Sequence, residues 1–381
     1  MSNYTLYDYG WMVGNATRWA AFQRALDAVI RLGDVVLDLG AGYGAMAFEA
    51  LRRGASKVIA VEPADSVVMG RTLAAANGLD DRIEHHRAFL EKVSARPVDV
   101  VIADLRGSSP FMPGHFEAIA HARAAWLKPG GRLVPVRDRL FVAPLRDAKL
   151  VEGFLAPWAA AHEHVDMRHA RAVLANWIHR ANPKAGSVLG TGVVFGEVDY
   201  ADPALRTYGR AVDIDVASAG PVHGAVVWFE AELAPGVFLS NRPDEHETVY
   251  GRSVLGFAEP LEVPAGGGLR VHVRITPVQG AWIWRWTATT LDAEGREGAT
   301  RRGDTWSGSI VDPARLARRA PEARPETSEE ARLLAFVLAA MDGATSVADI
   351  AGKAQAAFPE LLPDADVALD RVGAFVERHA R

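Results

Sequence analysis

The stretch VVLDLGAGYGAMAFEAL at residues 35–51 decides the fold class of this chain. Its apolar first half favours a β-strand that ends at Asp38, and its second half favours a helix. Between them lies a G-x-G-x-G turn formed by Gly40, Gly42 and Gly44. Glycines let the backbone turn tightly and come close to a ligand, because they have no β-carbon. A strand, a glycine turn and a helix in this order favour a ligand site in an α/β fold.

A second carboxylate, Glu62, strengthens this prediction. It closes the next strand-like run, KVIAVE at residues 57–62, eighteen positions after Gly44. A carboxylate at this place can accept hydrogen bonds from two ribose hydroxyls. The glycine spacing is not the G-x-G-x-x-G of the dinucleotide fingerprint, because the last glycine comes one residue early. Together these features predict a nucleoside-type cofactor; the alternative is a tight turn followed by an incidental glutamate.

Strand-like and helix-like segments alternate over about residues 30–140. The apolar runs that predict strands are DVVLDLG at 34–40, KVIAVE at 57–62, IEHH at 83–86 and VDVVIAD at 98–104. Helical segments are expected at 15–31, 45–53, 65–77 and 115–127, and LKPGGRLVP at 127–135 favours a helix end, a turn and another strand. This alternation predicts a doubly wound, mainly parallel sheet.

The rest of the chain has a different pattern of predicted secondary structure. After about residue 140 it consists of short β-like segments punctuated by glycine and proline, which fits an antiparallel barrel or sandwich. We expect a Rossmann-like domain with an N-terminal helical segment at 1–140, a β-barrel-like domain at 141–311 and a helical module at 325–381. The stretch at 312–330 is rich in proline, alanine and charge and is predicted to be a linker.

Composition argues against several classes of function. The formal net charge of −5 argues against non-specific electrostatic binding to nucleic acid. The absence of cysteine excludes disulfides and thiolate metal sites, and no H-E-x-x-H spacing suggests a metal site either. No run approaches the roughly eighteen apolar residues of a membrane span, and the N-terminus lacks the features of a secretory signal. We therefore expect a cytoplasmic protein with no nucleic-acid, membrane or metal partner.

The glycine turn and its neighbours carry a resemblance. D-x-G-x-G-x-G followed by V-x-A-V-E resembles the S-adenosyl-L-methionine site of class I methyltransferases. More narrowly, the first 140 residues resemble the core of the protein arginine methyltransferases, and MVGNATR at 12–18 is similar to that family's M-L-x-D-x-x-R. In that family this arginine pairs with the cofactor's carboxylate, which implies the same contact for Arg18. The β-rich half, with HGAVVWFEAEL at 223–233, is similar to the family's barrel more loosely.

The resemblance also implies the remaining cofactor contacts and a homodimer. Asp38 and the three glycines would hold the methionine portion, and Glu62 would bind the ribose. Leu90 and Glu91 would lie beside the adenine. Arginine methyltransferases commonly pair into rings, so a homodimer is expected by analogy.

The resemblance breaks down where the acceptor should bind. The family holds a guanidinium between two glutamates, in a pattern like S-E-W-M-G-Y…E, and a T-H-W loop. Here the first motif reads A-D-L-R-G-S, so Asp104 stands in place of the first glutamate and Arg106 follows. The second glutamate falls near Pro113, with Glu117 expected on the following helix. The T-H-W loop becomes T-V-Y within residues 240–250, and the family's N-terminal histidine falls on Tyr9.

One carboxylate accompanied by an arginine should bind a cationic acceptor poorly, because a guanidinium is bound most strongly by two carboxylates. Asp104 and Arg106 are therefore predicted to face a neutral or anionic acceptor. Arg106 could clamp a carboxylate while Asp104 orients it or a bound water. The alternative is a contact between the two side chains that only stabilises the loop.

Two further groups of residues are weighed against ordinary packing roles. Trp282, Trp284 and Trp286 share one face of a strand, which favours a barrel core or a dimer seam over an aromatic wall for an acceptor. The histidines of the nucleotide-binding half are expected to pack or to face solvent; they are His85, His86, His115 and His121.

The C-terminal helices carry a second, shorter resemblance. MDGATSVADIA at residues 341–351 is similar to the winged-helix modules that bind leader peptides in pathways for ribosomally made, modified peptides. The alternative is a helical appendage. The leading prediction is therefore an S-adenosyl-L-methionine-dependent methyltransferase that acts on a peptide or natural-product precursor, with a carboxylate as a candidate acceptor. Methylation of a small metabolite, arginine methylation and a non-catalytic cofactor-binding regulator are the alternatives.

Overall fold

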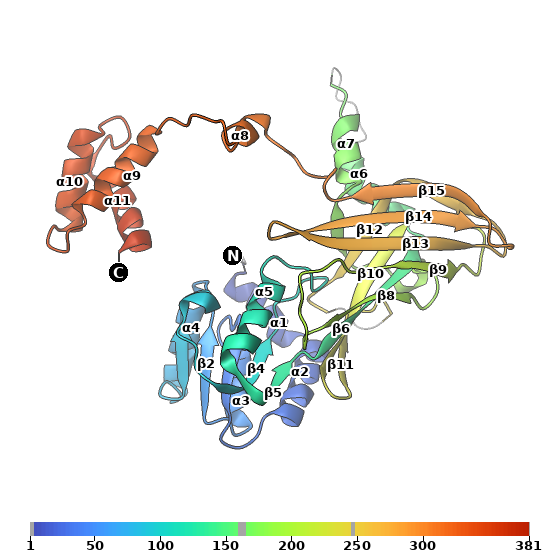
Figure 1. Cartoon of the computed structure of the whole chain (residues 1–381), viewed down its shortest axis with the longest axis horizontal. Helices are drawn as coiled ribbons and strands as arrows, with labels where there is room; N and C mark the ends of the chain where they lie inside the picture. Colours follow the sequence, from blue (N-terminus) through green and yellow to red (C-terminus); the bar gives the residue numbers. More distant parts are fainter. Residues whose placement is uncertain (1–3, 159–164, 245–247, 381) are drawn as a thin grey trace. The chain divides into compact units, whose positions relative to one another are not determined.

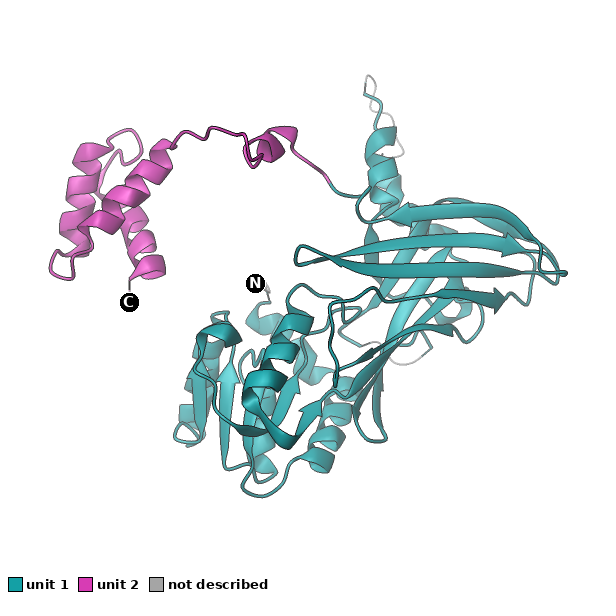
Figure 2. Ribbon diagram, in the orientation of Figure 1, with its two compact units in different colours: residues 1–309 teal, residues 310–381 magenta. Residues whose placement is uncertain are grey.

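The computed structural model describes residues 4–158, 165–244 and 248–380 of the chain. It divides into two compact units, residues 1–309 (unit 1) and residues 310–381 (unit 2), as Figure 2 shows. The domains expected at 1–140 and 141–311 lie together in unit 1, because their buried residues form one continuous core. The border between the units falls just ahead of the predicted linker, which contains the short helix α8 (Pro313–Ala317).

A five-stranded parallel sheet forms the first half of unit 1 (Figure 1). Its strands are β1 (Val35–Leu39), β2 (Lys57–Val61), β3 (Ile83–His86), β4 (Val98–Ala103) and β5 (Leu127–Val134). The helices of this half are α1 (Leu6–Gly14), α2 (Ala16–Val29), α3 (Ala45–Arg52), α4 (Ser66–Ala76) and α5 (His115–His121), with short helical turns at Leu90–Lys92 and Ala122–Trp126. The predicted parallel sheet of alternating strands and helices is therefore confirmed.

The sheet order β3-β2-β1-β4-β5 positions the candidate site. β1 and β2 are apolar, β-branched runs in which four of five residues are buried, as expected for strands covered on both faces. From β1 the chain moves outward to β2 on one side, and it later returns to β4 on the other side. The order therefore reverses between β1 and β4, and ligands of such sheets bind outside the carboxyl ends at this point. Gly40 follows β1 and Asp104 follows β4 there.

Two antiparallel sheets form the second half of unit 1 and confirm its predicted barrel-like character. The first has the order β7 (Ile178–Ala181), β12 (Arg252–Val263), β10 (Gly220–Ala234), β6 (Arg137–Leu145) and β8 (Val193–Asp199), with β11 (Val237–Ser240) paired to β10. The second has the order β15 (Glu297–Asp304), β14 (Ala281–Leu291), β13 (Gly268–Val278) and β9 (Ala211–Asp215). The sheets meet where β12 lies against β14 and β15 and where β8 lies against β9, so they enclose a core.

The tryptophan stripe of β14 is part of that core. Trp284 and Trp286 are only 3% and 2% exposed. Phe111, from the loop that follows β4, places its ring centroid 5.0 Å from that of Trp282 and 5.6 Å from that of Trp284. The stripe therefore joins the second antiparallel sheet to the loop after β4, and it does not form an open aromatic wall.

Some local structure differs from the expectation. α1, α6 (Ala148–Leu155) and α7 (Arg168–Leu174) are helices where none was predicted, and short turns lie at Ala156–Trp158 and Ala185–Ser187. The Lys-Pro-Gly-Gly segment at 128–131 does not separate a helix from a strand. It lies inside β5, where a register shift against β4 absorbs the extra residues.

Unit 2 contains three helices with a small core of their own. They are α9 (Glu329–Ala340), α10 (Val347–Ala357) and α11 (Ala365–His379), which agree with the predicted helical segments. Ser328, Ser346 and Asp364 cap them, each through a side-chain oxygen that accepts a backbone N–H of the first turn. Leu333, Val337, Ile350, Leu362 and Val372, among other residues, fill the core.

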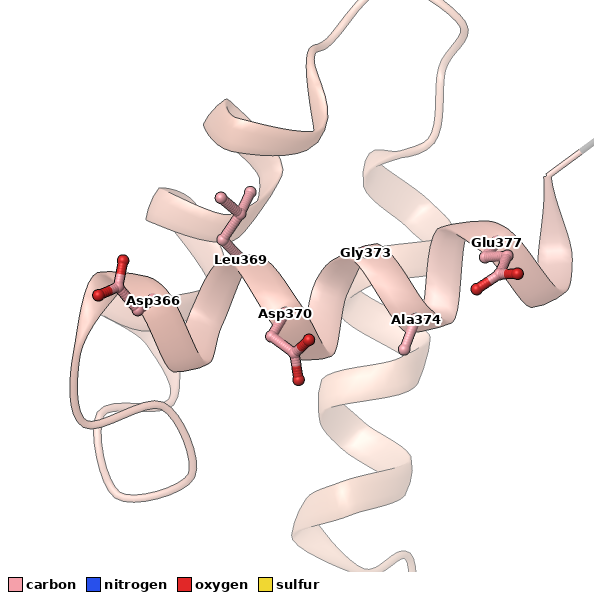
Figure 3. A pocket seen from close by; sticks show the side chains of 6 residues that line it. All are labelled: Asp366, Leu369, Asp370, Gly373, Ala374 and Glu377. Carbon is pink, nitrogen blue, oxygen red and sulfur yellow. The ribbon is translucent and has the colours of Figure 1, made fainter.

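A shallow hollow lies on the outer face of α11 (Figure 3). Its lining residues are Asp366, Leu369, Asp370, Gly373, Ala374 and Glu377. Three carboxylates make this face acidic. No helix of the described residues is both long and apolar enough to cross a bilayer.

Candidate active site

Glu62 holds the glycine turn in place. Gly40 and Gly42 have φ angles of 73° and 57°, which side chains with a β-carbon rarely adopt. A β-carbon on Gly42 would lie only 2.6 Å from the ring of Tyr9. The buried Glu62 carboxylate accepts the backbone N–H of Gly42 at 3.0 Å and that of Ala64 at 2.8 Å. It therefore joins the ends of β1 and β2, and each oxygen keeps a lone pair for a ligand hydroxyl.

Asp38 is a buried carboxylate with an unused acceptor. The residue is 3% exposed, and its Oδ2 atom has no hydrogen-bond partner among the described residues. Burial raises the pKa of Asp38 to about 7; a backbone hydrogen bond from Ala47 opposes this rise, and the Glu62 charge adds to it. A buried acceptor beside a second carboxylate suits a ligand that brings a cation.

Arg18 and Asp104 form a buried ion pair across the site. Arg18 is the third residue of α2, whose first turn is capped by Asn15. Its Nε and Nη2 atoms donate to Oδ2 of Asp104 at 3.1 and 2.6 Å, and its Nη1 atom donates to the carbonyl of Met12 at 3.2 Å. The two side chains are 9% and 10% exposed. The family resemblance implied a cofactor contact for Arg18, and Asp104 was predicted to face the acceptor; the structure brings the two side chains together.

Arg106 does not face an open acceptor space, which corrects the expectation for this residue. Its side chain is fully buried: Nη1 donates to Oδ1 of Asp104 at 3.1 Å, and Nη2 lies 3.2 Å from Oδ1 of Asp138. The guanidinium also lies 5.2 Å from the ring centroid of Phe229. A buried cation requires an anion beside it, and Asp138 on β6 supplies that anion. The alternative expectation, a contact between Asp104 and Arg106, is what the structure contains.

Asp138 was missed by the sequence analysis. Tyr200, directly after β8, donates its hydroxyl to Oδ2 of Asp138 at 2.5 Å, and Nε2 of His115 lies 2.9 Å from the same hydroxyl. Burial, with the nearby Arg106 charge, lowers the pKa of His115 to about 3. His115 is therefore a neutral packing histidine at pH 7, as expected.

Tyr250 is the second residue that was missed as part of the site, although its loop was noted. The expected T-V-Y segment is Thr248 to Tyr250, and residues 245–247 of the same loop lie outside the described residues. The Tyr250 hydroxyl donates to Oδ2 of Asp104 at 2.6 Å and accepts from Nε of Arg18 at 3.0 Å. Tyr250 therefore closes a triangle with the ion pair.

The loop after β4 is fixed to the antiparallel sheets by two more contacts. The Ser108 hydroxyl lies 2.8 Å from that of Ser253 on β12, and Nδ2 of Asn241 donates to the Ser108 carbonyl at 3.2 Å. Both contacts join residues more than 130 positions apart in the chain. The part of the site that contains Asp104 is thus built jointly by both halves of unit 1.

Charge compensation determines the protonation states of this triangle. Burial alone would raise the pKa of Asp104, but Arg18 and Arg106 together hold it below its usual value. Burial would lower the pKa of Arg18, but Tyr250 and Asp104 raise it. Burial also raises the pKa of Tyr250. At pH 7 the site therefore contains an ionised Asp104 between two charged arginines and a neutral phenol.

The other residues predicted to bind the cofactor are Gly44, Leu90 and Glu91. Gly44 is the residue ahead of α3, with a φ angle of 90°. Leu90 is buried in the hydrophobic core, whereas Glu91 beside it is exposed. No group of three or more potential metal ligands gathers in the part of the chain that the structure describes.

Comparisons with known proteins decide the family. Residues 36–131, which span the glycine turn and Asp104, match the family described as "Methyltransferase domain". The chain is 30% identical to protein arginine N-methyltransferase 6 of Danio rerio over 245 residues, which are 61% of this chain and 70% of that protein. The chain belongs to the protein arginine N-methyltransferase family. It is an S-adenosyl-L-methionine-dependent methyltransferase.

Other relatives extend this likeness. The arginine N(omega)-methyltransferase of Streptomyces achromogenes subsp. streptozoticus is 28% identical over 69% of this chain and 74% of that protein. Among solved structures, Arabidopsis thaliana protein arginine methyltransferase 10 has a TM-score of 0.68 at 21% identity and covers 79% of this chain. A Trypanosoma brucei PRMT1 enzyme–prozyme complex with AdoHcy has a TM-score of 0.67 at 20% identity and covers 78%. At these identities the two structures support the fold alone.

The residues of this methyltransferase fit the cofactor. Asp38 has a buried oxygen without a partner among the described residues that could accept from the amino group, and Glu62 would have lone pairs for ribose hydroxyls. When bound, S-adenosyl-L-methionine supplies an electrophilic methyl group on a sulfonium. The glycine turn would let the backbone come close to the cofactor. Asp38, Glu62 and Asp104 lie at the carboxyl ends of β1, β2 and β4, at one edge of the sheet. Alignment of the acceptor is what the protein must add, because an in-line displacement depends mainly on proximity and orientation.

The raised pKa of Asp38 predicts how cofactor affinity depends on pH. Below pH 7 the carboxyl must lose its proton before it can pair with a cation, so affinity for S-adenosylhomocysteine should rise about tenfold between pH 6 and pH 8. Asp38→Asn should remove this rise and bind weakly at both values. Isothermal calorimetry at the two pH values measures it, and a wild-type affinity that stays flat would remove Asp38 from the amino-group contact.

Proposed function

We propose that this methyltransferase transfers its methyl group to a neutral or anionic acceptor on a peptide or natural-product precursor, with a carboxylate as the leading candidate. The observation that supports this is the position of Asp104 between Arg18 and Arg106. A guanidinium acceptor would approach one carboxylate that two arginines already neutralise. Like charges held close in a site of low polarity repel each other strongly, so a cationic acceptor is disfavoured.

The protonation state of Asp104 supports the same acceptor class. A hydroxyl or amine acceptor usually needs a general base, and a base works best when its pKa lies near the working pH. The pKa of Asp104 is lowered by its two arginines, so Asp104 is a weak base at pH 7. His115, whose pKa is lowered to about 3, is buried against Tyr200. A carboxylate acceptor is nucleophilic without a base, so this site could methylate it by alignment alone.

Arginine methylation is the second candidate, and family membership favours it. The relatives that the chain matches in Danio rerio and Streptomyces are named for arginine as their acceptor. If Arg18 turned toward the cofactor, Asp104 would regain part of its free charge. Even then Arg106 would remain paired with it, and no second carboxylate stands at the position that falls on Pro113.

The peptide part of the proposal rests on unit 2. We infer that residues 325–381 recognise a peptide acceptor, because they form a separate helical core behind a linker of exposed residues and resemble leader-peptide modules. A small-metabolite acceptor would leave these helices with a purely structural role. A homodimer is proposed on the family likeness.

Deletion of residues 325–381 should separate cofactor binding from acceptor use. We expect S-adenosylhomocysteine affinity to stay within twofold of the full-length value, because the cofactor residues all lie in unit 1. Methyl transfer to a peptide acceptor should fall at least tenfold, because the acceptor would lose its docking module. Calorimetry and label transfer measure the two effects. Unchanged transfer would point to a small-metabolite acceptor instead.

The acceptor class is tested by the chemistry of the product. Full-length protein is incubated with cell extract and S-adenosyl-L-methionine labelled in the methyl group, and the labelled products are treated with mild alkali. A methyl ester releases its label as methanol, whereas a methylated nitrogen keeps it. We expect released label and a peptide-sized product in mass spectra. Label that resists alkali would contradict the carboxylate proposal.

A further inference from the structure

Tyr250 reaches Asp104 from a tight turn that lies outside the strands. The turn runs from Thr248 to Gly251, and the backbone N–H of Gly251 donates to the Thr248 carbonyl at 3.3 Å. Val249 and Tyr250 form its middle, ahead of β12. Any movement of this backbone moves the Tyr250 hydroxyl, which donates to Asp104 at 2.6 Å. The contact with Asp104 therefore requires a turn that is held in place.

Arg180, on the edge strand β7, supplies part of this support. Its Nε atom donates to the carbonyl of Tyr250 at 2.9 Å, and its Nη2 atom donates to the carbonyl of Val249. Arg180 lies opposite Ser253 of β12, so its side chain runs back to the turn that precedes this strand. These two carbonyls are the only hydrogen-bond partners of the side chain among the described residues. A planar guanidinium that binds two acceptors fixes their orientation as well as their distance.

Gly251 makes room for the Arg180 side chain, and Asn241 holds the same turn from the buried side. Gly251 has a φ angle of 62°, and a β-carbon there would lie 2.9 Å from Cγ and 3.0 Å from Nε of Arg180. Nδ2 of the fully buried Asn241 donates to the Gly251 carbonyl and, at 3.2 Å, to the carbonyl of Ser108. The turn is thus held on two sides, and one of them is tied to the loop that carries Asp104.

We propose that Arg180 is a positioning residue for methyl transfer. By holding the backbone of the turn Thr248–Gly251, it keeps the Tyr250 hydroxyl on Asp104. Arg180 acts through Tyr250 and does not itself touch the reacting atoms. The inference rests on the proposed placement of the acceptor beside Asp104, and it does not depend on which class of acceptor is methylated.

The physical reason is that Tyr250 supplies a direction without a charge. The two arginines that donate to Asp104 attract its carboxylate from either side, whereas the neutral phenol fixes one oxygen through a hydrogen bond. An in-line displacement depends on such alignment, so a small shift of the carboxylate slows the reaction. Arg180 itself is exposed, and its loss should disturb this alignment far more than it disturbs folding.

The first measurement shows whether Arg180 holds the turn. Hydrogen exchange of the full chain is followed by mass spectrometry of peptides that span Thr248 to Gly251. We expect exchange there to be about tenfold faster in Arg180→Ala, because two hydrogen bonds to the turn are lost. Arg210→Ala, which removes another exposed arginine that donates to a carbonyl, at Val194, should leave this exchange unchanged. Urea unfolding of both variants should match the wild type.

The second measurement shows whether Arg180 acts through the Tyr250 hydroxyl. Label transfer from S-adenosyl-L-methionine is measured at saturating cofactor over a dilution series of cell extract, which gives an apparent kcat and KM. Arg180→Ala and Tyr250→Phe should each lower the apparent kcat about tenfold and change KM little. In the Tyr250→Phe background, Arg180→Ala should lower kcat by less than about twofold more, because the hydroxyl that it positions is gone. Arg180→Lys keeps the charge without the fork and should stay slow, whereas Arg210→Ala should match the wild type.

Each contrary outcome refutes a separate point. Unchanged exchange of the turn in Arg180→Ala would show that Arg180 does not hold it. Fully additive losses of kcat would mean that Arg180 does not act through Tyr250, and a wild-type kcat in Arg180→Lys would reduce its role to charge. A wild-type kcat in Tyr250→Phe would overturn this inference together with the proposed acceptor position beside Asp104. Label that resists alkali would overturn only the carboxylate acceptor and would leave the role of Arg180 standing.

Discussion

Replacement of Arg106 by methionine is expected to lower the free energy of unfolding of unit 1 by about 3–5 kcal/mol. The substitution removes the only cationic partner of Asp138 among the described residues and one of the two cationic partners of Asp104, while it keeps an apolar chain of similar length. Two carboxylates would then be left with less compensation in a buried site. Urea unfolding followed by tryptophan fluorescence measures the effect on unit 1, because all ten tryptophans lie within residues 1–309.

Two further variants show whether the loss comes from the ion pair. Arg302→Met replaces an exposed arginine of β15 and should change stability by no more than about 0.5 kcal/mol. Asp138→Asn added to Arg106→Met should recover part of the loss, because it removes one uncompensated charge. If Arg106→Met cost less than about 1 kcal/mol, the buried role of Arg106 would be wrong, and a role toward the acceptor would be open again.

Replacement of Glu62 by alanine is expected to weaken S-adenosylhomocysteine binding about hundredfold. Two hydrogen bonds from ribose hydroxyls to a charged acceptor are lost, and each contributes about 1.5–3 kcal/mol. The glycine turn also loses the carboxylate that accepts from Gly42 and Ala64. Calorimetry at pH 8 measures the affinity.

Matched variants make this prediction specific to the Glu62 carboxylate. Glu62→Gln keeps one side-chain acceptor and should fall between wild type and alanine. Glu152→Ala, which truncates an exposed glutamate of α6, should leave affinity unchanged. An affinity of Glu62→Ala within twofold of wild type would show that the ribose is bound elsewhere.

The parallel sheet could be predicted because its signals are local. β1, β2 and β4 are short apolar runs whose flanking turn residues mark both ends, and burial on both faces requires such runs. The glycine turn and Glu62 lie within thirty residues of each other, so spacing alone brings them together. Helix α1 was missed because Gly10 and Gly14 disfavour helices. The capping box of Thr5 and Asp8 was the signal that could have found it.

The contacts of the acceptor side could not be predicted, because they join residues far apart in sequence. Arg18 and Asp104 are 86 positions apart, and Tyr250 is 146 positions from Asp104. Nothing in a local pattern distinguishes an arginine that faces a ligand from one that neutralises a buried carboxylate. A weak signal did exist at Asp138, which stands in the strand RDRLFVAPL and ends fully buried. A buried aspartate needs a cationic partner, and Arg106 was available.

The most direct test of the central claim is a search for methylated arginine. The claim is that Asp104, already paired with Arg18 and Arg106, does not bind the guanidinium of an arginine acceptor. Full-length protein is incubated with labelled S-adenosyl-L-methionine and either free arginine or arginine-rich peptides, and acid hydrolysates are separated by mass spectrometry. We predict no methylarginine above the level without enzyme, while the same preparation transfers label in cell extract. Formation of N-methylated arginine at ordinary enzymatic rates would contradict the account.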